Sequence, residues 1–150
     1  MIIRGLERSD FDAVIEIAQS LPEWFTNSGI DSIRKDIVFQ MGIIGIENRL
    51  PVGFLTFFVN QGVATIGWMG VRPNYHRGGV GKAMLEHLKD CLARARVNKI
   101  LVSTLGDSVD YEPYARTRAF YRKSGFSDSK LILHPDNPEQ EEELILELKF

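Results

Sequence analysis

Three closely spaced glycines, Gly78, Gly79 and Gly81, stand where a strand-like run of residues gives way to a helix-like one. Around them the chain reads VRPNYHRGGVGKAML, a stretch without acidic residues. Glycine permits tight turns and the close approach of another molecule to the backbone. The first N–H groups of a helix have no acceptor within the helix, and the helix dipole places partial positive charge at that end. This pattern predicts a binding site for an anion such as a diphosphate.

Two further glycines interrupt the segment that leads into this loop. Gly67 and Gly70 lie within residues 63–71, which otherwise have the composition of a strand. Glycine weakens a strand unless it marks a bulge or the close approach of another molecule. We therefore expect part of a ligand to lie along this strand while the loop binds its phosphates.

The positive charge of this region is local. Arg72, Arg77 and Lys82 flank the glycines, whereas the whole chain of 150 residues has a formal net charge of −2. Without a chain-wide basic excess, composition gives no reason to expect nucleic acid or a membrane surface as a partner. The hydrophobic content of 44% suits a single domain, residues 1–150, with a sizeable core.

Cysteine content and the N-terminus indicate the compartment. The single cysteine, Cys91, excludes an intramolecular disulfide and a multi-cysteine metal site. The N-terminal residues MIIRGLERSDF lack the apolar segment of a signal peptide, and no run approaches the roughly eighteen apolar residues of a membrane span. We therefore expect a cytoplasmic protein, and no metal is implied.

Hydrophobic periodicity predicts an α/β fold in which helices flank both faces of a mixed, mostly antiparallel sheet. Because short turns join the strands before the glycine loop, these strands should form an antiparallel meander. The strand, helix and strand around the loop should then form a parallel crossover. The predicted strands are 2–4, 42–47, 52–60, 63–71, 99–104, 130–134 and 144–149, and the predicted helices are 11–21, 31–39, 82–96 and 113–124.

Two segments resemble the GNAT superfamily of acetyl-CoA-dependent N-acetyltransferases. The loop pattern of that family, Gln/Arg-x-x-Gly-x-Gly/Ala, corresponds to residues 76–81, with His76 in place of the usual first residue. A second family motif, Tyr followed by three residues and then Gly-Phe, corresponds to Tyr121, Gly125 and Phe126. The order of the predicted elements also agrees over nearly the whole chain. The Walker loop and the dinucleotide-binding fingerprint fit this stretch poorly.

The resemblance implies transfer of an acetyl group from acetyl-CoA to a primary amine by direct nucleophilic attack. It places the pantetheine along the strand that precedes the loop, where a backbone N–H would polarise the thioester carbonyl. It places the diphosphate on the backbone amides of the loop. The implied cofactor-binding residues are Met69, Gly70, Val71, Arg77, Gly78, Gly79, Val80, Gly81 and Lys82.

The resemblance also makes Tyr121 the general acid for the departing CoA thiolate. An unperturbed thiol has a pKa near 8.5 and a tyrosine about 10, so a positioned phenol can protonate the thiolate. The base that takes the proton of the amine is left open, because Thr65 stands where some family members have a glutamate. Glu112, Glu23 and Asp110 are the candidates.

Two groups of charges adjoin the second motif. One hypothesis is that three acidic residues attract a cationic acceptor. They are Asp107, Asp110 and Glu112. The basic residues of the helix that follows are interpreted mostly as a solvated face. They are Arg116, Arg118, Arg122 and Lys123.

The acceptor itself is not identified by the sequence. A small-molecule amine and a peptide amine both fit, and an exposed sheet edge near the C-terminal strand is a candidate surface for a homodimer. The main alternative to an enzyme is a non-catalytic acyl-CoA-binding sensor or interaction module. A mononucleotide-binding protein that uses the same loop is a further alternative.

Overall fold

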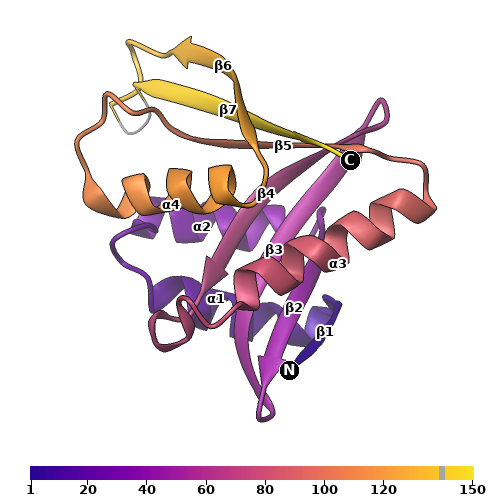
Figure 1. Cartoon of the computed structure of the whole chain (residues 1–150). Helices are drawn as coiled ribbons and strands as arrows, with labels where there is room; N and C mark the ends of the chain where they lie inside the picture. The colour runs from indigo at the N-terminus through magenta and orange to yellow at the C-terminus, as the bar shows by residue number, and fades with distance from the viewer. Residues whose placement is uncertain (139–140) are drawn as a thin grey trace.

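Apolar β-branched and aromatic runs in the middle and at the end of the chain form a single sheet. The computed structural model describes residues 1–138 and 141–150, and within these ranges the strand order is β1-β2-β3-β4-β5-β7-β6 (Figure 1). β4 and β5 are parallel, and every other neighbouring pair is antiparallel. The strands are β1 (Ile2–Gly5), β2 (Met41–Glu47), β3 (Leu50–Asn60), β4 (Val63–Val71), β5 (Lys99–Leu105), β6 (Ser127–Leu133) and β7 (Glu142–Lys149).

The helices cover both faces of the sheet, as predicted. In Figure 1, α3 (Val80–Arg94) and α4 (Glu112–Lys123) lie in front of the sheet, and α1 (Phe11–Gln19) and α2 (Asn27–Asp36) lie behind it. Short 3₁₀ turns at 8–10 and 73–75 precede α1 and the glycine loop. In the described ranges, no helix has both the length and the apolar character needed to cross a bilayer. The predicted mixed, mostly antiparallel fold is confirmed.

Two helix starts differ from prediction because of their caps. α2 begins at Asn27 rather than at residue 31, since the Thr26 hydroxyl oxygen accepts a hydrogen bond of 3.0 Å from the Gly29 N–H. α3 begins at Val80 rather than at residue 82, because Gly79 adopts a left-handed φ of 83° and serves as its N-cap. The second cap brings the amides of the glycine loop into the first turn of a helix.

Each face of the sheet carries its own core. Successive residues of a strand point to opposite faces, and in β3 Leu55 belongs to the cluster under α3 and α4, whereas Phe54 belongs to the cluster under α1 and α2. Both side chains are fully buried. We call these the α3/α4 face and the α1/α2 face.

A bulge between β3 and β4 changes the course of β4. The register shifts between Leu55 and Phe57, and the Trp68 N–H donates to the Thr56 hydroxyl oxygen at 2.9 Å. A side chain at Gly67 would collide with Gln40 and Thr56. Gly67, for which a bulge was one of the two readings, lies at this bulge, and the buried Thr56 replaces the missing ladder acceptor. A polar residue within the apolar run VGFLTFFV was the signal for this role.

Replacing Thr56 by Val should therefore destabilise the fold. Thr56 is fully buried, so the Trp68 N–H would lose its acceptor and the free energy of unfolding should fall by about 1–3 kcal/mol. Chemical denaturation would measure this loss. Thr65→Val, on the partly buried part of β4, is the control and should change stability by about 0.5 kcal/mol or less. Equal losses in both variants would contradict this role.

Candidate active site

The two parallel strands at the centre of the sheet diverge. β4 and β5 pair only from Ala64–Ile66 to Ile100–Val102, and β5 then continues along β7 (Figure 1). Beyond Ile66, β4 therefore has a neighbour on the β3 side and a free edge on the β5 side. This free edge, residues 67–71, leads directly into the glycine loop.

The register shows which polar groups point to the free edge. The Arg72 N–H donates to the Val52 carbonyl oxygen at 2.8 Å, which makes Val71 and Gly53 a pair without mutual hydrogen bonds. In an antiparallel ladder such residues direct their N–H and C=O groups away from the partner strand. Val71 and, two residues earlier, Met69 therefore present these groups to the gap between β4 and β5.

Gly70 has a different role from the one expected. Because hydrogen-bonding directions alternate along a strand, the Gly70 N–H and C=O point toward β3. A side chain at Gly70 would crowd Leu21, Phe25 and Phe54 on the α1/α2 face. Packing inside the protein thus explains this glycine without a ligand. Met69 and Val71 are the predicted strand residues whose backbone can pair with another molecule.

The loop presents a series of amides at the start of α3. Arg77 and Gly79 have left-handed φ values of 65° and 83°. The Gly78 N–H donates a hydrogen bond of 3.1 Å to the Tyr75 carbonyl oxygen and is therefore already engaged within the loop. Ala83 donates to the Gly79 carbonyl at 2.9 Å, so the N–H groups of residues 80–82 precede this first helical bond. A Cβ added at Gly79 would meet no atom within 4 Å, so the space over this residue is open. The geometry fits a diphosphate held by backbone amides.

The side chains around the loop divide into free and engaged cations. Arg77 and Lys82 are exposed and form no ion pair within the described ranges. Arg72, expected to flank the loop, instead donates to the Pro51 carbonyl at 2.8 Å and lies 3.7 Å from Glu16. Two of the three predicted cations are thus available to an anion.

Gly81 brings α4 against the loop. The Phe120 ring lies 3.0 Å from the position that a Cβ of Gly81 would take, so any side chain there would displace α4. The next residue, Tyr121, is 6% exposed, and its hydroxyl lies 3.6 Å from the Met69 sulfur. The two family motifs therefore meet at the free edge of β4.

Burial determines the protonation state of Tyr121. Loss of hydration raises the pKa of the phenol well above its ordinary value of 10. Phe120 and Phe126 pack edge-on against the ring, each with a centroid separation of 5.3 Å. The hydroxyl therefore stays protonated through the physiological range and can act there as a proton donor.

The predicted bases lie together, at the other end of α4. Arg116 forms ion pairs with Glu112 at 2.9 Å and with Glu23 at 3.7 Å, and both carboxylates are exposed. Glu112 precedes Tyr121 by nine residues, which is about 13 Å along a helix. Asp110 is exposed in the loop before α4. The structure thus brings Glu23 and Glu112 to each other but not to the phenol.

The interpretation of the acidic loop and the basic helix face was partly wrong. Asp107 accepts two hydrogen bonds from Arg122, at 3.0 and 2.6 Å, which hold its pKa below the usual range, and also contacts Arg118 at 3.1 Å. Arg118 is not solvated but 4% exposed, and it donates to the carbonyls of Leu105 and Gly106. Asp107 is therefore neutralised internally rather than free to attract an acceptor.

Trp24, in the loop between α1 and α2, contacts both α4 and the glycine loop. The Trp24 indole N–H lies 3.1 Å from the Pro113 carbonyl and 3.0 Å from the Thr117 hydroxyl in α4. Its ring meets His76 edge-on at 5.7 Å, and a ring nitrogen of His76 lies 2.7 Å from the Val71 carbonyl. Trp24 thus bridges α4 and the loop.

Comparisons with known proteins agree with this geometry. The acetyltransferase (GNAT) domain family matches residues 41–128, more than half of the chain. The fold is similar to that of a GNAT-family protein from Desulfovibrio desulfuricans, with 19% identity over 99% of this chain and 98% of that one and a TM-score of 0.85.

Two further solved structures have the same fold. The ribosomal-protein-S18-alanine N-acetyltransferase of Escherichia coli is 22% identical over 99% of this chain and 92% of its own, with a TM-score of 0.78. An aminoglycoside 6′-N-acetyltransferase complexed with coenzyme A is 13% identical over 99% and 97%, with a TM-score of 0.75. The family predicted from the two sequence motifs is confirmed, and this chain belongs to the GNAT acetyltransferases.

Proposed function

We propose that this protein transfers an acetyl group from acetyl-CoA to a primary amine. The amides of residues 80–82, with Arg77 and Lys82, bind the diphosphate, and the free edge of β4 pairs with the pantetheine. The Met69 or Val71 N–H then polarises the thioester carbonyl and stabilises the oxyanion as the amine attacks. Tyr121 gives its proton to the CoA thiolate.

One observation carries this proposal: the Tyr121 hydroxyl lies 3.6 Å from the Met69 sulfur, beside the unpaired backbone of β4. A backbone donor for the oxyanion and a protonated phenol thus border the same gap. Acyl transfer needs this pairing of a donor at the carbonyl with an acid at the leaving group.

The acceptor is proposed only as a class. The two named relatives act on a protein alanine and on an aminoglycoside, both of which are amines. We accordingly place a small-molecule or peptide amine in the gap. Cytoplasmic location and a homodimer stay predictions. β6, an edge strand of the described sheet and the neighbour of the C-terminal strand β7, is the candidate edge for a second copy.

Thiol release tests the proposal. Purified protein would be incubated with acetyl-CoA and a panel of small amines, aminoglycosides and peptides with free N-termini, and free CoA would be followed with a thiol reagent. Amine-dependent release is expected, and titrations should show binding of CoA but not of ATP or NAD. Binding of CoA without release with any amine would contradict catalysis.

A non-catalytic acyl-CoA-binding module is the second candidate. The observation that favours it is Arg116, which neutralises Glu112 and Glu23, the two carboxylates first considered as bases. Under this alternative the loop would still bind CoA, and no amine would accelerate thiol release.

A further inference from the structure

A chain of three polar side chains crosses the half-sheet formed by β5, β7 and β6. The Ser103 hydroxyl donates to one carboxylate oxygen of Glu143 at 2.6 Å. A ring nitrogen of His134, which follows β6, lies 2.9 Å from the other oxygen. Ser103 is exposed, while Glu143 and His134 are partly buried.

The polar chain lies on the α1/α2 face. Val102, Thr104 and Leu144 are buried on the opposite face, and strand alternation directs Ser103 and Glu143 away from it. The main contacts of α1 with the sheet are to β3 and β4, and Ser103 is exposed.

Ser103 also stands where the strands diverge. The last pair between β4 and β5 is Ile66 with Val102, so Ser103 is the first β5 residue beyond it and faces the start of the free edge. Met69 lies two residues past Gly67, which is about 7 Å at the usual strand rise. Ser103 therefore borders the end of the gap that lies nearest to the last β4–β5 pair.

We propose that Ser103 and Glu143 remove the proton of the attacking amine, with His134 as a positioning residue that orients the carboxylate. This inference rests on the proposed acetyl transfer. The amine arrives as an ammonium ion. One of its protons passes to the Ser103 oxygen while the Ser103 hydrogen passes to Glu143, and the neutral nitrogen then attacks the carbonyl carbon. As the carbon–sulfur bond breaks, the thiolate takes the proton of Tyr121; the new amide nitrogen gives its surplus proton back to the Tyr121 oxygen, and Glu143 releases its proton to solvent.

The charges on this face suit the assignment. The hydrogen bonds from Ser103 and then from His134 lower the pKa of Glu143, so the carboxylate is ionised at neutral pH. Glu147, further along β7, forms ion pairs with Lys99 at 3.1 Å and with Lys149 at 3.3 Å. Asp36 of α2 accepts from the Trp68 indole at 2.8 Å. Of these three carboxylates, only Glu143 is hydrogen-bonded to a residue at the divergence of the strands.

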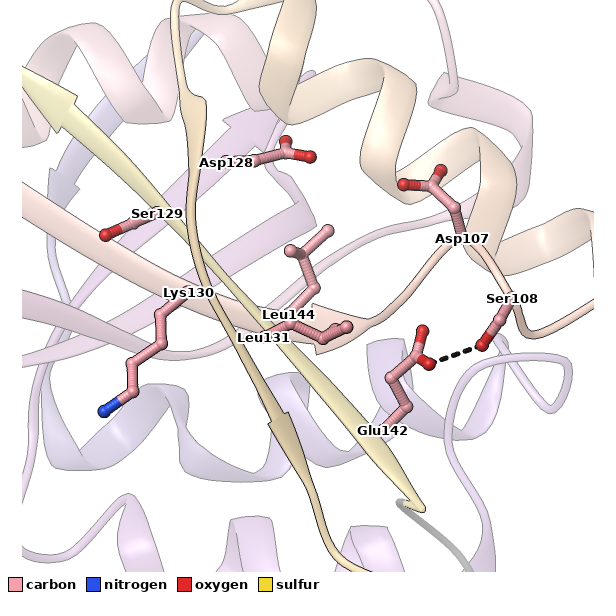
Figure 2. A pocket seen from close by; sticks show the side chains of 8 residues that line it. All are labelled: Asp107, Ser108, Asp128, Ser129, Lys130, Leu131, Glu142 and Leu144. Atoms are coloured by element: carbon pink, nitrogen blue, oxygen red, sulfur yellow. Dashed lines mark hydrogen bonds between the residues drawn. The ribbon is translucent and has the colours of Figure 1, made fainter.

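The neighbouring residue of β7 provides a matched control. Strand alternation places Glu142 on the face opposite to Glu143. Figure 2 shows Glu142 hydrogen-bonded to Ser108 in a groove that also contains Asp107 and Asp128. Glu142→Gln removes the same charge from the same strand without touching the polar chain. It should leave acetyl transfer unchanged.

The test compares pH profiles of thiol release for an amine that the wild-type protein acetylates. Glu143→Gln should lower kcat/KM for the amine roughly 100-fold near pH 7, as loss of a general base does. The deficit should shrink as the pH approaches the pKa of the amine, because the amine then arrives without its extra proton. Ser103→Ala should behave likewise, Ser103→Thr should retain most activity, and CoA affinity should stay unchanged in all three.

Two results would overturn the inference while leaving acetyl transfer intact. One is a Glu143→Gln profile that coincides with the wild type, and the other is a deficit that is equal at every pH in a variant with normal thermal unfolding. A wild-type protein that binds CoA yet acetylates no amine would overturn both the inference and the proposed function.

Discussion

Tyr121→Phe should lower kcat for thiol release by about 100-fold or more while leaving the Kd for CoA within about twofold of the wild-type value. The substitution removes the proton that the thiolate would receive, and general acids contribute about 10²–10⁴ to such rates. It keeps the ring that packs between Phe120 and Phe126, so the core should be preserved. Steady-state kinetics and calorimetric titration with CoA would measure the two effects separately.

Tyr111→Phe is the matched control for this prediction. Tyr111 lies just before α4, and its hydroxyl donates to the Glu23 carbonyl at 2.8 Å in an exposed position. Removing that hydroxyl should change kcat less than twofold. If Tyr121→Phe and Tyr111→Phe turned over alike, Tyr121 would have no part in proton transfer.

The buried position of Tyr121 also predicts a pH dependence. A raised pKa means that the phenol keeps its proton above pH 10, where an exposed tyrosine would lose it. The wild-type rate should therefore show no alkaline decline that titration of this group would cause up to about pH 10. A fall in kcat between pH 8 and 9, absent in Tyr121→Phe, would contradict the assignment.

Local patterns were sufficient for the parts of the site that depend on backbone. The amide-lined loop follows from three glycines before an amphipathic helix, and the parallel pair β4 and β5 follows from the strand, helix and strand around that loop. The divergence of the two strands beyond Ile66 was not predicted. Gly67 and Gly70 were correctly singled out, but Gly70 is required by Leu21, Phe25 and Phe54, which lie far away in sequence. Such packing requirements do not appear in a local pattern.

Charged side chains were predicted less well, because their partners are distant in sequence or on other strands. Arg118 looked like part of a solvated face, yet the end of β5 and the residue after it supply two carbonyl acceptors, those of Leu105 and Gly106. Glu143 looked like one acid in a run of glutamates, EEE at 141–143, and only the β5–β7 register brings it to Ser103. The periodicity of single segments contains no information on these pairings.

Gly79→Ala should weaken CoA binding about five- to thirtyfold. Gly79 has a φ of 83°, which costs an alanine about 1–2 kcal/mol, so the free loop would relax and binding would have to restore the strained geometry. The same substitution at Gly62 is the control, because Gly62 has a φ of 77° in the β3–β4 turn and, like Gly79, has no atom within 4 Å of the added Cβ.

The comparison of these two variants separates strain from ligand binding. Both should lose similar stability in thermal unfolding, since both place an alanine in a left-handed conformation with open space around it. Only the change at Gly79 moves the amides of residues 80–82, so only that variant should lose affinity in a CoA titration. Equal affinity in both variants would mean that the diphosphate is bound by side chains such as Arg77 and Lys82 rather than by the backbone at the start of α3.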